Sequence, residues 1–127
     1  METKYIDVDG RWGVIVCYNY DEEDKQDMWS IMRSFNMTSQ SANRAINILS
    51  NYNTGMAVSN DDIRMSAIFI SKATSPSQFW DTLNHELYHV CTAIIDYYDE
   101  PYDQEGAAHL QGYLMRKAVE LIGEPCK

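Results

Sequence analysis

The sequence predicts an α+β fold, in which a small, twisted, mostly antiparallel sheet of three to four strands packs on helices. Short runs rich in Val, Ile and Tyr predict the strands, and longer stretches with apolar residues at helical spacing predict the helices. No internal repeat, linker or low-complexity tract interrupts the 127 residues. We therefore expect a single domain over residues 1–127.

Four runs predict strands. The first alternates polar and apolar residues and ends at Asp9-Gly10, a favourable turn pair. The second is apolar almost throughout, which is typical of a strand covered on both faces. The last two are joined by Asn60-Asp61-Asp62, whose residue types favour a turn. The runs are residues 4–8, 12–18, 55–59 and 63–71.

Four stretches predict helices. The first follows Asp21 and has an acidic first turn, and the second begins near Ser39. The third has a strong start, with Ser75 as N-cap and Pro76 in the first turn, and should run to residue 97 or 98. The fourth should span residues 104–122, between an Asp103 cap and Gly123.

The charge balance limits the possible partners. The formal net charge is −9, which repels phosphate backbones and anionic lipid, so we expect neither nucleic acid nor a membrane surface as a partner. No stretch approaches the roughly 18 apolar residues of a membrane span, and the N-terminus does not resemble a signal peptide. The expected location is cytoplasmic. Three widely spaced cysteines predict reduced thiols, so nitrogen and oxygen would bind any metal.

The third predicted helix carries His85-Glu86-Leu87-Tyr88-His89 near its middle. Imidazoles four residues apart lie one above the other on a helix, at the spacing that lets both bind one zinc ion. The intervening carboxylate points to a neighbouring face, where it can act on a water at the metal. The alternative is that both histidines are ordinary exposed residues on the polar side of a surface helix.

A catalytic zinc site needs a third protein ligand. On the fourth predicted helix, Glu105, His109, Gly112 and Arg116 share one face, and an antiparallel packing would fold this face over the histidines. In this arrangement the glycine would allow a close helix crossing. The candidates for the third ligand are Glu105, Asp103 and His109.

The pentapeptide at residues 85–89, followed by Glu-Gly-Ala-Ala-His-Leu-Gln-Gly-Tyr-Leu at residues 105–114, resembles the gluzincin metallopeptidases. More narrowly, it resembles the minigluzincin-like group of short HExxH proteins of bacteria and phages. The resemblance covers residues 53–116. It implies a zincin-like fold with an HExxH active-site helix followed by a helix that bears the ligand glutamate.

The resemblance also implies a role for each residue. One Zn²⁺ per chain would be bound by His85, His89 and Glu105, and Glu86 would be the general base in peptide-bond hydrolysis. The transition-state oxyanion would be stabilised by zinc together with His109, Tyr102 or Tyr113.

The expected partner is a peptide or protein substrate, extended along the free edge of a strand at residues 63–71. The alternative function is a catalytically silent, metal-binding accessory protein of phage or bacterial origin with the same fold.

Overall fold

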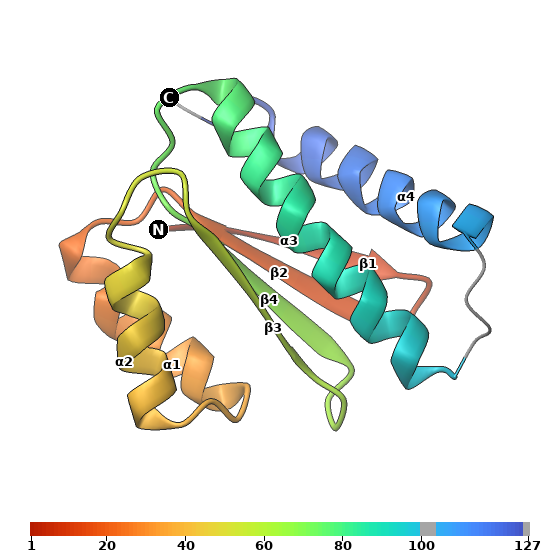
Figure 1. The fold of residues 1–127 in the computed structure, drawn as a ribbon, viewed down its shortest axis with the longest axis horizontal. Helices are drawn as coiled ribbons and strands as arrows, with labels where there is room; N and C mark the ends of the chain where they lie inside the picture. Colours follow the sequence, from red (N-terminus) through yellow and green to blue (C-terminus); the bar gives the residue numbers. More distant parts are fainter. Residues whose placement is uncertain (100–103, 126–127) are drawn as a thin grey trace.

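The computed structural model describes residues 1–99 and 104–125, and these form three layers (Figure 1). A four-stranded sheet is covered on one face by α1 and α2 and on the other by α3 and α4. The elements are β1 (Glu2–Val8), β2 (Trp12–Tyr18), a short 3-10 turn (Glu22–Asp24), α1 (Lys25–Ser34), α2 (Ser39–Ile48), β3 (Gly55–Asn60), β4 (Met65–Ile70), α3 (Pro76–Tyr97) and α4 (Gln104–Ile122).

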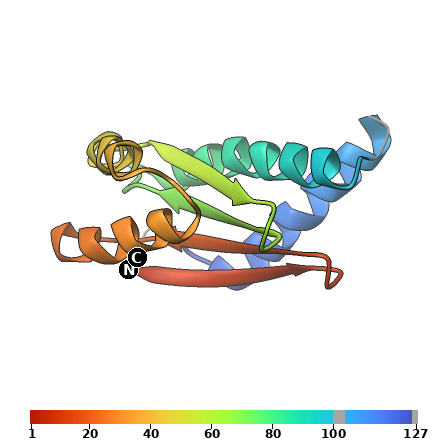
Figure 2. The same ribbon diagram turned by 90° about the horizontal axis from the view of Figure 1, so that it is seen from below.

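The strand order is β1-β2-β4-β3. β1 pairs antiparallel with β2, β2 parallel with β4, and β4 antiparallel with β3. The α+β class with a mostly antiparallel sheet is therefore confirmed. The two outer strands, β1 and β3, form the free edges of this sheet. In Figure 2, α3 lies beside β3 and β4, whereas α4 lies towards β1.

The prediction that residues 63–71 form a free strand edge is wrong. β4 lies between β2 and β3, and its last five residues are all buried. The reason is the apolar run Ala67-Ile68-Phe69-Ile70, whose side chains alternate between the two helical layers. A strand that is apolar on both faces is favoured in the interior of a sheet.

Local signals set the start of α3. The Ser75 hydroxyl accepts a hydrogen bond from the Gln78 N–H at 3.2 Å, and Pro76 occupies the first turn. The buried side of the helix packs on the sheet through Phe79, Leu83, Leu87, Val90 and Ile94.

α4 packs on the same core through Leu114, Ala118 and Ile122. Gly123, at φ +67°, follows the last turn and donates its N–H to the Val119 carbonyl at 3.0 Å. The predicted cap at Asp103 lies outside the described residues. None of the helices in the described part of the chain has the length and hydropathy needed to cross a membrane.

The polar face of α4 does not cover the histidines, contrary to prediction. Glu105, His109, Gly112 and Arg116 are all exposed, because the apolar residues of α4 turn the opposite side of the helix towards the core. A Cβ built on Gly112 would meet no atom within 4 Å. This glycine therefore does not serve a close helix crossing.

We predict that Gly112→Ala raises the free energy of unfolding by about 0.5–1 kcal/mol, because alanine favours the helix and has open space here. Urea denaturation measures the change. The matched control is Gly123→Ala, where the positive φ makes the same substitution cost about 1 kcal/mol. If Gly112→Ala lowered the free energy of unfolding, the open space beside Gly112 would be contradicted.

Candidate metal centre

His85 and His89 project together from the exposed side of α3. Their Nε2 atoms are 3.3 Å apart, and their ring centroids are separated by 5.0 Å. Two nitrogens bound to one tetrahedral zinc at about 2.05 Å lie about 3.3 Å from each other. The same separation also allows one neutral imidazole to donate a hydrogen bond to the other. The pair can therefore accept a zinc ion without moving apart.

Glu86 lies between these histidines in the sequence but faces inward, with only 6% of its surface exposed. One potential ligand atom from each of His85, Glu86 and His89 lies within 4.8 Å of the others. Burial raises the pKa of the Glu86 carboxyl, and the neighbouring His85 and His89 oppose this increase. A carboxyl with a raised pKa, beside two potential metal ligands, is suited to accepting a proton.

Gly55, the first residue of β3, lies directly beneath this carboxyl. A Cβ built there would be 2.7 Å from Thr82 Cγ2, 3.1 Å from Glu86 Cγ and 3.2 Å from Glu86 Oε2. The strand and α3 can approach this closely only because residue 55 has no side chain. This role of Gly55 was not predicted from the sequence, although a lone glycine in a strand pattern often marks such an approach.

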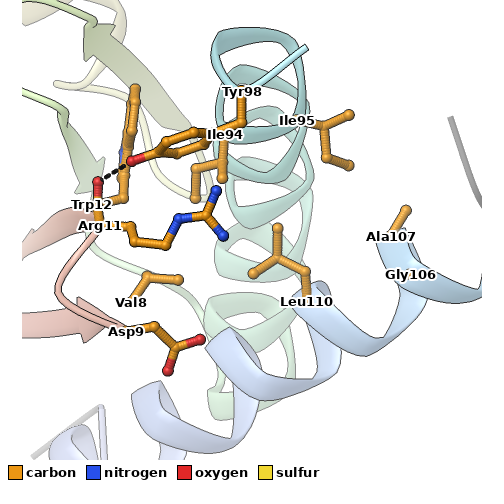
Figure 3. A pocket seen from close by; sticks show the side chains of 10 residues that line it. All are labelled: Val8, Asp9, Arg11, Trp12, Ile94, Ile95, Tyr98, Gly106, Ala107 and Leu110. Atoms are coloured by element: carbon orange, nitrogen blue, oxygen red, sulfur yellow. Dashed lines mark hydrogen bonds between the residues drawn. The ribbon is translucent and has the colours of Figure 1, made fainter. Parts of the chain in front are cut away.

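Glu105 is not part of the ligand group that the described residues form around His85. It lies in the first turn of α4, and the next residues, Gly106 and Ala107, line a cavity opposite Ile95 of α3 (Figure 3). Ile95 is about 9 Å along the helix axis from His89 and about 120° around it. The structure therefore does not bring Glu105 to the histidines, and its role as third ligand remains a prediction.

The other candidate residues are also separate from the histidine pair. His109 is exposed on α4 and lies outside the ligand group. The hydroxyl of Tyr113 donates a hydrogen bond to the Asp7 carbonyl, so this tyrosine points to β1. Asp103 and Tyr102 lie outside the described residues. No oxyanion-stabilising side chain is therefore identified among the described residues.

A cavity of about 450 Å³ lies away from the histidines. It lies between the β1–β2 turn and the splayed ends of α3 and α4, with walls that include Trp12, Ile94 and Leu110. Figure 3 shows Arg11 reaching across it, with the guanidinium carbon 4.0 Å from the centre of the Tyr98 ring. The histidine pair instead faces solvent.

Cys17 and Cys91 are buried free thiols. Burial raises the pKa of Cys17 to about 12 and that of Cys91 to about 11, so both are protonated at neutral pH. Cys126 lies outside the described residues. The expectation of reduced core thiols is met for the two described cysteines.

We predict that Gly55→Ala lowers the free energy of unfolding by about 1–3 kcal/mol, because the new methyl group collides with Thr82 and Glu86. Thr82→Ser removes the nearest atom, so the double variant should recover most of the loss. Urea denaturation of both single variants and the double variant measures the coupling. Strictly additive effects would show that β3 and α3 are not in close contact here.

The chemistry available at the cluster follows from its three side chains. Two imidazoles offer nitrogen ligands to a divalent metal, and the buried carboxyl beside them can accept a proton. This combination suits metal-assisted hydrolysis. No protein-family model, curated protein or solved structure matches this chain.

Proposed function

We propose that this protein is a zinc-dependent, gluzincin-like peptidase that binds zinc through His85 and His89. The observation that supports it is the 3.3 Å separation of the two Nε2 atoms beside the buried Glu86 carboxyl. When bound, zinc supplies a Lewis acid that activates water for attack on a carbonyl. Glu86 accepts the proton that the water loses and returns it to the departing amine.

In this proposal the substrate lies along β3, in place of the strand expected from the sequence. The Ser71 N–H donates a hydrogen bond to the Thr54 carbonyl at 2.9 Å. From Thr54 onward, every second residue therefore directs its backbone N–H and C=O groups towards β4. The N–H and C=O groups of Gly55, Ala57 and Ser59 then point to the free edge. An extended peptide that pairs with these groups passes next to Glu86, which contacts Gly55.

Glu105 is the third zinc ligand in this proposal, and His109 contributes to oxyanion stabilisation. Both roles require the first turns of α4 to lie on the histidine side of α3. The zincin-like assignment of the fold belongs to the same proposal. It is supported by a helix with the HExxH motif above a sheet whose outermost strand is antiparallel.

A second candidate function is a metal-binding accessory protein without catalytic activity. It is favoured by the position of Glu105, which lies outside the ligand group of His85. Two imidazoles without a third protein ligand can still hold a metal, but they orient it less firmly.

We predict that the purified protein binds about one zinc per chain and loses it on His85→Ala or His89→Ala. Elemental analysis after zinc loading and dialysis measures the content. His109→Ala is the matched control, because His109 lies outside the ligand group and its loss should leave the zinc content unchanged. Absence of stoichiometric zinc from the unsubstituted protein would rule out both candidate functions.

Glu105→Ala tests the third ligand separately. If Glu105 binds zinc, this variant loses the metal, and retention of zinc would contradict its role.

We further predict that Glu86→Gln keeps its zinc but loses about a hundredfold or more of the peptidase activity. The measurement is the hydrolysis rate of a fluorescence-quenched peptide library by the zinc-loaded proteins. Equal rates for the variant and the unsubstituted protein, with zinc bound to both, would favour the accessory protein.

A further inference from the structure

The two free edges of the sheet differ in how they are protected. β1 carries charged Glu2, Lys4 and Asp7, the kind of residues that discourage pairing with another strand. β3 has the sequence Gly-Met-Ala-Val-Ser-Asn, with neither a charge nor a proline. An unprotected apolar edge is able to pair with an additional strand. The unprotected edge is the one beside Glu86.

A pocket of about 180 Å³ lies between α2 and this edge. Its walls include Ala45, Ile48, Leu49 and Met56, and Ile48 is 51% exposed although it is a large apolar residue. Arg44 also lines the pocket and is itself exposed. Arg44 makes no ion pair or hydrogen bond with any residue that the structure describes. The pocket therefore combines an apolar wall with an uncompensated positive charge.

Gly55 connects the pocket to the candidate catalytic residue. It lines the pocket, and it also lies against Glu86 on the α3 side of the sheet. Met56 packs in the α1/α2 layer, whereas Ala57 packs in the α3/α4 layer. A strand added beside β3 alternates in the same way, so one side chain faces the pocket and the next faces Glu86.

We propose that this pocket selects the substrate, which is an extended peptide with a large apolar residue two positions from an acidic one, so that both side chains face the pocket. The apolar side chain fills the space at Ile48 and Met56, and the carboxylate lies near Arg44. The peptide bond of the substrate that lies beside Glu86 is then within about two residues of the apolar side chain in the pocket. The cleavage step rests on the proposed function, whereas peptide binding to β3 does not.

The test is to pan a phage-displayed library of random decapeptides on the Glu86→Gln protein, which binds without cleaving. We expect enrichment of peptides with Leu, Ile, Met or Phe two positions away from Asp or Glu. Ile48→Ser should weaken binding of a selected synthetic peptide by about tenfold in fluorescence anisotropy.

Arg44→Glu should reverse the charge preference from acidic to basic peptides. Arg116→Glu is the matched control, because it makes the same charge change on the exposed side of α4 and should leave the preference unaltered.

Two results would overturn the inference: no consensus peptide, or a consensus that Arg44→Glu leaves unchanged. A stable dimer in sedimentation equilibrium that excludes peptides would also overturn it, because a second copy would then occupy the edge. Zinc content and cleavage are measured separately on the same preparations. If the protein binds no zinc but still prefers the predicted peptides, the proposed function is refuted and the pocket is not. If it cleaves peptides without this preference, the pocket is refuted and the proposed function is not.

Discussion

The close contact between Gly55 and the Thr82–Glu86 turn of α3 is the constraint on which the rest of the site depends. A Cβ on Gly55 would come within 2.7 Å of Thr82, so only glycine lets α3 settle this near the outermost strand. This approach buries Glu86 against the strand. His85 and His89 are about 100° and 60° away from Glu86 around the helix, so burying the carboxyl turns both imidazoles outward past the edge.

The same orientation of α3 explains why, in this structure, α4 adds no ligand to the candidate metal site. Gln111 of α4 donates hydrogen bonds to the Asn84 carbonyl and side-chain oxygen, at 3.2 Å and 3.0 Å. Asn84 lies about 100° from His85 around the helix, on the side away from the β3 edge. α4 therefore packs against a side of α3 that lies about 100° from His85 and about 140° from His89 around the helix. A metal held by His85 and His89 alone would have its remaining coordination positions open to water or substrate.

The parts of the structure that depend on local chemistry could be predicted from the sequence. α3 begins and α4 ends at the expected residues, because Ser75-Pro76 and Gly123 act on the turns next to them. The sheet order could not be predicted, because the parallel pairing of β2 with β4 joins segments about fifty residues apart. The outward orientation of Glu105 was within reach of sequence reasoning. Leu114, Ala118 and Ile122 define an apolar side of α4 opposite to it, and that side had to be buried.

In the proposed function, β3 separates chemistry from recognition on a single strand. Its α3 side faces Glu86 through Gly55, and its α2 side borders the pocket through Met56. Successive residues of a strand face opposite sides, so a bound peptide presents alternate side chains to the two regions. Substitutions on α2 can then change which peptide binds without altering the groups around Glu86. Because pairing with the backbone of β3 would fix the register of such a peptide, the proposed pocket would also determine which peptide bond lies beside the Glu86 carboxyl.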